Sequence, residues 1–175
     1  MIRFLLTALS AFALWLLLTA GTGEIILWST PELLAGGLLA LLTGAMARSF
    51  FCRKGDYRMA NPIRWIVLAA YLIGPFFFEL TKANLDVAYR VITGKIRPGI
   101  VRISPGLSKD LSVLMLANSI TLTPGTLTVD VDEESGDLFV HMIHIDPGIE
   151  KQAVVGPQDV PSFYRFADWI RRIAE

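Results

Sequence analysis

Three ionisable residues follow the last long apolar stretch of this sequence at helical spacing. Glu79, Lys82 and Asp86 lie three and four residues apart, so a helix would carry them on one face, with Arg90 one turn further on. This spacing predicts a ladder of ion pairs along that face. Ionisable side chains at membrane depth are costly and mark ion pathways, so these three residues are our ion-pathway candidates. The alternative is that they lie beyond the hydrocarbon and only pair or bind a neighbouring protein.

Other reactive side chains in the sequence do not form a recognisable site. His141 and His144 are three residues apart on an expected strand, where an odd separation directs them to opposite faces and away from a shared zinc ion. The acidic residues around Glu134 have the composition of a solvated turn, not the alternating pattern of a calcium loop. The single cysteine, Cys52, excludes an internal disulfide. Because the sequence also lacks a phosphate-binding loop and a serine nucleophile motif, it predicts no metal site, no cofactor and no enzymatic activity.

The N-terminal residues 1–51 have the composition of a membrane element. Twenty residues without a charge run from Phe4 to Gly23, and a second uncharged run extends from Leu33 to Ala47. A helix needs about 20 apolar residues to cross hydrocarbon about 30 Å thick. The second run meets this length if its helix extends from Pro31 to about residue 51. Thr30 can cap such a helix, and Pro31 suits its first turn. We therefore predict a hairpin of two antiparallel transmembrane helices over residues 1–51.

The second of these helices carries small residues at a regular spacing. Gly36, Ala40 and Gly44 recur every four residues. Small side chains at this spacing let two membrane helices approach closely and associate by van der Waals contact. We predict a helix-packing face here, directed to the first helix of the hairpin or to another subunit. The alternative is the ordinary glycine and alanine content of a membrane helix.

A third apolar segment covers residues 62–92 and becomes amphipathic in its second half. Asn61 and Pro62 predict the start of a helix, as a cap and a first-turn proline. Apolar side chains dominate the first half, with Arg64 as the exception. Pro75 predicts a kink because it lacks the backbone N–H that a helix interior requires. The second half carries its charges on one side, as an amphipathic helix does.

Basic residues predict the orientation in the membrane. The first loop has no lysine or arginine, whereas the segment from Arg48 to Arg64 holds five basic residues against Asp56 alone. Because lysine and arginine concentrate in cytoplasmic loops, we predict that residues 52–64 form a basic cytoplasmic loop. Further basic residues after position 90 favour a cytoplasmic C-terminal domain. A third segment that crossed the bilayer would place that domain outside. Either this segment does not fully cross, or the hairpin has the opposite orientation, so the sequence leaves the crossing of residues 62–92 open.

Residues 96–175 have the pattern of a small α+β domain with the element order β-α-β-β-α. The expected elements are, in order, strand Gly99–Ser104, a helix from Ser108 to about Asn118, strands Leu127–Val131 and Leu138–Ile145, and helix Pro161–Ala174. The predicted fold class is therefore a membrane α-helical N-terminal part followed by this domain. The membrane part consists of two transmembrane helices plus a third apolar, partly amphipathic helix.

Several motifs occur together in the order typical of one family. They are Phe12–Leu17 (FALWLL), Phe78–Ala88 (FELTKANLDVA), Asn118–Thr126 (NSITLTPGT) with the strand after it, and Leu138–Asp146 (LFVHMIHID). In this combination the sequence resembles the E-type subunits of the Mrp-type (Mnh, Pha) multisubunit monovalent cation/proton antiporters, over almost its whole length. The Thr-Pro-Gly-Thr run with its preceding Asn-Ser is fairly specific, and several segments in the right order are more specific than any one of them.

The resemblance implies an accessory membrane subunit of a complex that exchanges Na⁺, or another monovalent cation, for H⁺. Such a subunit would serve assembly or stability, while ion translocation lies in the large polytopic subunits. Its expected partners are those subunits and the lipid bilayer of the cell membrane. No nucleic-acid partner is expected, because 16 basic and 16 acidic residues leave no net charge. The alternative function is a membrane-tethered α+β module that recruits a cytoplasmic partner.

For the signature motif we predict a rigid structural corner. The residues concerned are Asn118, Thr121, Thr123, Pro124, Gly125 and Thr126. The proline and glycine suit the two central positions of a type II turn. The threonine hydroxyls can hydrogen-bond to that turn, and the asparagine can satisfy backbone groups near a helix end. The corner would press on the membrane face or on a partner subunit, with a direct role in ion passage as the alternative.

Overall fold

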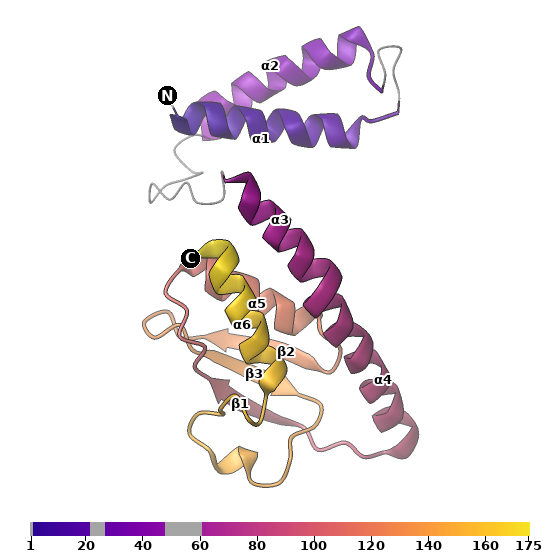
Figure 1. The fold of residues 1–175 in the computed structure, drawn as a ribbon, viewed down its shortest axis with the longest axis vertical. Helices are drawn as coiled ribbons and strands as arrows, with labels where there is room; N and C mark the ends of the chain where they lie inside the picture. The colour runs from indigo at the N-terminus through magenta and orange to yellow at the C-terminus, as the bar shows by residue number, and fades with distance from the viewer. Residues whose placement is uncertain (1, 22–26, 48–60) are drawn as a thin grey trace. The chain divides into compact units, whose positions relative to one another are not determined.

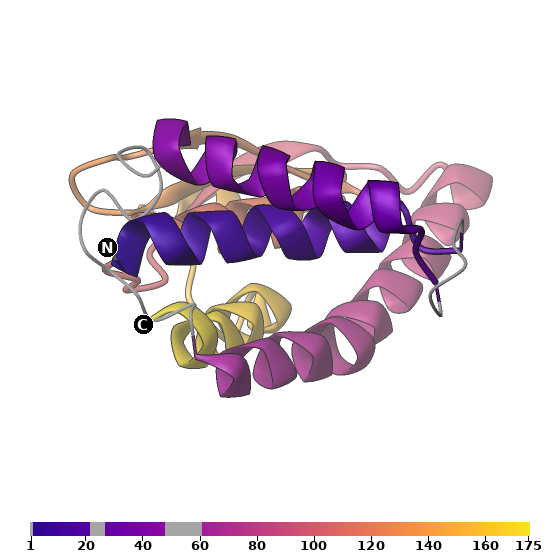
Figure 2. The same ribbon diagram turned by 90° about the horizontal axis from the view of Figure 1, so that it is seen from above.

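The computed structural model describes residues 2–21, 27–47 and 61–175, and the chain divides into two compact units, Met1–Ala60 and Asn61–Glu175. In the first unit, helices α1 (Ile2–Leu18) and α2 (Thr30–Ala47) lie side by side (Figures 1 and 2). Cys52 and the part of the basic loop up to residue 60 lie outside the described residues, as does the predicted extension of the second helix to residue 51.

Two tryptophans tie the helices of the first unit together. The indole Nε1 of Trp15 donates to the carbonyl oxygen of Glu32 at 3.0 Å, and that of Trp28 donates to the carbonyl oxygen of Leu16 at 2.8 Å. The carboxylate of Glu32 in turn accepts a hydrogen bond from the backbone N–H of Ser29 at 2.8 Å. Such a bond satisfies a donor at the start of the helix, where the helix dipole also favours an acid.

Two helices among the described residues are long and apolar enough to cross a membrane. They are Thr30–Ala47, with 18 residues, and Pro62–Thr93, with 32 residues. Helix α1 is apolar but shorter, with 17 residues. It ends before the uncharged run does, and Gly21 then adopts a φ of +102° that favours glycine.

The second unit begins with one long helix in three parts. Helix α3 (Pro62–Tyr71) starts where Asn61 accepts a hydrogen bond from the backbone N–H of Ile63 at 3.0 Å. A π-helical turn, η2 (Leu72–Phe76), follows and contains Pro75, and helix α4 (Phe77–Thr93) completes the helix. The wider π-helical turn gives the ring of Pro75 room. It also accommodates a residue that has no backbone N–H to donate, as π-bulges do in other helices.

A three-stranded antiparallel sheet forms the rest of the unit together with two helices. The elements are β1 (Gly99–Ile103), α5 (Asp110–Leu122), β2 (Thr126–Val131), β3 (Leu138–Met142), the short 3-10 helix η3 (Ile149–Lys151) and α6 (Pro161–Ala174). The strand order is β1-β3-β2. The core lies between sheet and helices and includes Val101 and Val140 of the sheet, Leu116 of α5 and Phe166 of α6, all of them buried.

The boundaries of α5 and β3 differ from the sequence-based expectation. Helix α5 starts at Asp110 and not at a Ser108 cap, because the carboxylate of Glu175 accepts the backbone N–H groups of Ser108 (2.6 Å) and Lys109 (3.3 Å). The helix also continues past Asn118 to Leu122. Strand β3 ends at Met142, because the next residues leave the β2 ladder and pair with other segments.

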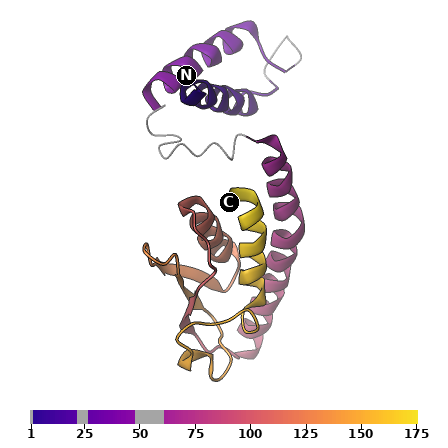
Figure 3. The ribbon, with the colours of Figure 1, turned by 60° about the vertical axis from the view of Figure 1, so that its left-hand side comes forward.

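The long helix packs along the domain, and Figure 3 shows α6 beside α3. Tyr71 is buried, with its ring centroid 5.9 Å from that of Phe166, and its hydroxyl donates to Ser119 of α5 at 2.7 Å. The guanidinium of Arg64 donates to the carbonyl oxygen of Ile173, near the end of α6, at 2.6 Å. A cation is favourable at that end of a helix. Arg64, the one charge in the apolar half, therefore has a partner inside the domain.

Candidate functional site

Helix α4 pairs its charged residues differently from the predicted ladder. Glu79 is buried, and its carboxylate accepts a hydrogen bond from the guanidinium of Arg165 on α6 at 2.8 Å. Asp86 and Arg90 form the expected i,i+4 ion pair at 2.6 Å. Within the described part of the chain, Lys82 lies within 4 Å of no carboxylate oxygen. The ladder is wrong at Lys82, because Glu79 faces α6 and not its neighbours along α4.

The signature motif forms a tight corner between α5 and β2. The backbone N–H of Thr126 donates to the carbonyl oxygen of Thr123 at 3.2 Å, and Gly125 has a φ of +85°. Both features fit a type II turn with Pro124 and Gly125 at its centre. The hydroxyl of Thr123 donates to the carbonyl oxygen of Ser119, and the hydroxyl of Thr126 donates to that of Ile120. These hydroxyls satisfy carbonyl groups left open at the end of α5.

The corner also contacts α4, and this contact requires glycine. A Cβ on Gly125 would lie 2.9 Å from Cγ2 of Val87 on α4 and 2.9 Å from Cγ2 of Ile143. The carbonyl oxygen of Gly125 accepts the backbone N–H of Ile143 at 2.8 Å. Gly125 is thus restricted twice, by its positive φ and by the close approach of α4.

Two signature side chains lie away from the turn itself. Asn118 is exposed within α5, and its amide donates to the carbonyl oxygen of Leu114 at 2.9 Å. Since α5 continues to Leu122, this asparagine does not stand at the helix end where the sequence analysis expected it. Thr121 accepts the backbone N–H of Thr128 at 3.2 Å, which ties α5 to β2.

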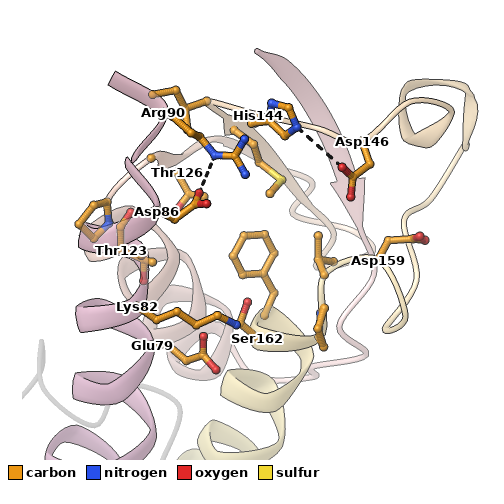
Figure 4. Close-up of a pocket in the computed structure, with 18 residues that line it drawn as sticks. Glu79, Lys82, Asp86, Arg90, Thr123, Thr126, His144, Asp146, Asp159 and Ser162 are labelled. Atoms are coloured by element: carbon orange, nitrogen blue, oxygen red, sulfur yellow. Dashed lines mark hydrogen bonds and ion pairs between the residues drawn. The ribbon is translucent and has the colours of Figure 1, made fainter. Parts of the chain in front are cut away.

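Four segments meet around a pocket of about 300 Å³, drawn in Figure 4. The charged residues of α4 form one wall, and Thr123–Thr126 of the corner form another. Two further walls complete the pocket. One consists of Met142, Ile143, His144 and Asp146, at and after the end of β3, and the other of Asp159–Phe163, at the start of α6. The Nε2 atom of His144 lies 3.7 Å from a carboxylate oxygen of Asp146. The pocket therefore unites the ion-pathway candidates with the signature motif, which are far apart in the sequence.

Sequence reasoning missed three residues of this site. Arg165 was part of an expected helix, but nothing in its local pattern pairs it with Glu79. Asp146 and Asp159 lie in connecting segments and line the pocket from the side opposite α4. A useful signal was available for Arg165, because it is a charged residue within the aromatic run Phe163–Phe166.

The small residues of α2 face α1. Gly36, Ala40 and Gly44 are the buried residues of α2. A Cβ on Gly36 would overlap the indole of Trp15, and one on Gly44 would lie 3.0 Å from the Cβ of Ala8. Gly37, on another side of the helix, has no atom within 4 Å of a Cβ built there. Within the hairpin, this face is thus occupied by α1.

Comparison with known proteins places these features in a family. Residues 8–157 match the family described as "Na+/H+ ion antiporter subunit". The E-type Na(+)/H(+) antiporter subunit of Bacillus subtilis is 34% identical over 120 residues, which are 67% of this chain and 72% of that protein. The protein of the same name from Alkalihalophilus pseudofirmus is 39% identical over 89 residues. That match covers 50% of this chain and 54% of the relative, so this chain spans about half of the relative's length.

A solved structure shares the fold over nearly the entire chain. It is a chain of the membrane-bound sulfane sulfur reductase, an archaeal respiratory membrane complex, with a TM-score of 0.78 and 34% identity over 98% of both chains. The four motifs recognised in the sequence, from Phe12 to Asp146, all lie within the range that matches the family. The resemblance seen in the sequence is therefore confirmed, and this chain belongs to the family of E-type Na⁺/H⁺ antiporter subunits.

Proposed function

We propose that this protein is an accessory subunit of a multisubunit Na⁺/H⁺ antiporter, which serves assembly or stability and does not carry the ions itself. The supporting observation is the pairing on α4, where Arg165 binds Glu79 and Arg90 binds Asp86. A carboxylate that relays protons or cations must exchange its partner during transport. Glu79 instead joins α4 to α6, and Asp86 is paired within α4, so we assign the ion pathway to other subunits.

The number of helices supports the same division of labour. An ion pathway through a membrane is built from several helices around a site near the bilayer midplane. The described residues contain two helices long and apolar enough to cross. The pathway must therefore be formed largely by partner subunits, for which we propose the large polytopic subunits of the complex.

We also propose that the domain after the hairpin is cytoplasmic. The support comes from the basic residues of the sequence, which concentrate between Arg48 and Arg64 and again between Arg90 and Lys109. The lipid bilayer of the cell membrane is then the second partner of the chain, in contact with the hairpin.

A second candidate function follows from the solved structure. That structure is of a respiratory membrane complex, and the likeness covers 98% of both chains. On this ground the chain could serve the same structural role within a membrane redox complex. The two candidates differ in the subunits that accompany the chain, since only a redox complex contains subunits with redox cofactors.

Exchange of the hairpin tests the accessory role against a membrane-tethered module. Residues 1–60 are replaced by an unrelated two-helix anchor, and residues 61–175 are kept together because α3 packs on α6. Under our proposal the chimera is made at normal levels but does not restore Na⁺-dependent proton flux in membrane vesicles of a deletion strain. A tethered module works from either anchor, so complete restoration would overturn the proposal.

A further inference from the structure

The long helix Pro62–Thr93 has two unlike sides. On one side Tyr71 packs against Phe166, and Glu79 binds Arg165. The other side exposes large apolar side chains at helical spacing. Between 62% and 84% of the surface is exposed for Ile63, Ile66, Ile73, Phe77, Leu85 and Ile92. An apolar surface of this extent on a folded protein marks contact with a membrane or a partner.

A position across the bilayer conflicts with the packing of α6. This helix lies along the uncharged stretch of the long helix, from Arg64 at one end to Glu79 at the other. That stretch would have to occupy the hydrocarbon if the helix crossed, because it is the longest part without a charge. Helix α6 would then enter the hydrocarbon with it.

Helix α6 is unsuited to hydrocarbon. The exposed fractions of the side chains of Arg165, Asp168 and Arg171 are 51%, 67% and 43%. Charged side chains are strongly unfavourable in the bilayer core unless they face a protein interior or a water-filled cavity. The helix Pro62–Thr93 therefore has the length and composition of a membrane-spanning helix. The charged helix α6 packed beside it, however, does not fit a position in the hydrocarbon.

The ends of the apolar side suit a lipid surface. Exposed Trp65 and Tyr89 stand near its two ends, and such aromatic side chains favour the level of the headgroups. Lys95 lies just beyond the C-terminal end, and basic residues of the segment 48–60 precede the N-terminal end. Basic residues in these places complement anionic headgroups. An apolar groove on a partner protein would not require basic residues at the two ends of this helix.

We propose that the helix Pro62–Thr93 lies in the plane of the cytoplasmic membrane surface, with its apolar side at the boundary between headgroups and acyl chains. The sheet and α6 then remain in water. This inference rests on the proposed membrane location of the hairpin. In this position the third apolar segment does not cross the membrane. The domain after it can therefore stay in the cytoplasm, as its basic residues favour.

Spin labels can measure the depth of this helix in the full chain, assembled with its partners in vesicles of phosphatidylcholine and phosphatidylglycerol. Cys52 is first replaced by serine, and single cysteines are introduced at Ile66, Ile73, Leu85 and Ile92. These side chains are exposed, so their replacement preserves the packing. Leu38→Cys on α2 and Asp168→Cys on α6 serve as the references for hydrocarbon and water. Collision rates with oxygen and with a water-soluble nickel complex give the depth of each label.

The expected result is one shallow depth, about 5–10 Å into the membrane, at all four positions. A depth that rises toward the midplane and falls again, by about 1.5 Å per residue, would show a crossing helix and overturn the proposal. Low collision rates with both reagents would show a protein partner and overturn it as well. Co-purifying subunits are scored on the same sample, so a failure of this topology is distinguishable from a failure of the proposed function.

Discussion

The carboxylate of Glu79 on α4 binds the guanidinium of Arg165 on α6 at 2.8 Å, across a sequence separation of 86 residues. At the other end of α6, Arg64 binds the carbonyl oxygen of Ile173. These two contacts hold α6 along the long helix at both ends. Glu79, which the sequence suggests for ion passage, therefore helps to hold α6 on the long helix.

Removal of this ion pair should destabilise the domain. For Glu79→Gln we expect a loss of about 1–3 kcal/mol in the free energy of unfolding, less than for a fully buried pair because Arg165 is half exposed. Unfolding of the purified chain in mild detergent measures it. Lys82→Gln is the control, with a change within about 0.5 kcal/mol. The reversed pair, Glu79→Arg with Arg165→Glu, should recover part of the loss. Lost ion exchange in Glu79→Gln with unchanged stability and assembly would instead indicate an ion pathway.

The contact between the signature corner and α4 can be tested by two matched glycines. Gly125 and Gly94 both have positive φ values, but only Gly125 has atoms of other residues close to the place of a Cβ. Gly94→Ala should cost about 1–2 kcal/mol for the backbone alone, and Gly125→Ala about 2–4 kcal/mol because steric overlap adds to it. Thermal unfolding of both variants measures the difference. Equal losses would show that the close approach to Val87 contributes nothing.

The helix-packing face of α2 offers a similar pair. Gly36→Ala places a methyl group on the indole of Trp15, whereas Gly37→Ala meets open space. We expect a loss of about 1–3 kcal/mol for Gly36→Ala from overpacking. Gly37→Ala should be neutral or slightly stabilising, by up to about 1 kcal/mol, since alanine favours helix. The amount of each variant in the membrane fraction and its melting temperature provide the measurement. A reversed order would place the packing on another side of α2.

Stability should depend on pH through Asp132, in the turn between β2 and β3. The backbone N–H groups of Ser135 and Glu134 donate to its carboxylate and hold its pKa below the usual value. A lowered pKa in the folded state stabilises the protein above the unfolded pKa of about 3.9, and this stability is lost as the pH falls through the folded value. Acid unfolding of Asp132→Asn should therefore be shallower below about pH 4 than that of the wild type. Identical slopes would remove Asp132 from the acid response.

Local signals predicted much of the second unit. Helix α6 occupies Pro161–Ala174 as expected, because a first-turn proline and the apolar spacing of Phe163, Phe166 and Ile170 are properties of the segment itself. Strand β2 and its hairpin turn also follow from alternation and from glycine. The third helix begins at Pro62 for the same reason, with Asn61 as its cap.

Long-range pairing could not be predicted in this way. The spacing of Glu79 and Lys82 indicates neighbours on one helix, whereas the actual partner of Glu79 comes from α6. Helix α5 was expected to end near Asn118, yet hydrogen bonds from Thr123 and Thr126 to its last carbonyl groups carry it to Leu122. Only a folded chain shows that the signature corner meets α4 at Val87.

The most direct test of the accessory role is to identify what co-purifies with the tagged chain in mild detergent, for the wild type and for Glu79→Gln. The account predicts a stoichiometric set of large polytopic antiporter subunits with the wild type. With Glu79→Gln it predicts less of the complex but the same Na⁺-dependent proton flux per assembled complex. A wild-type chain that purifies alone, or with only a soluble partner, would contradict the account, and so would a fully assembled Glu79→Gln complex without flux.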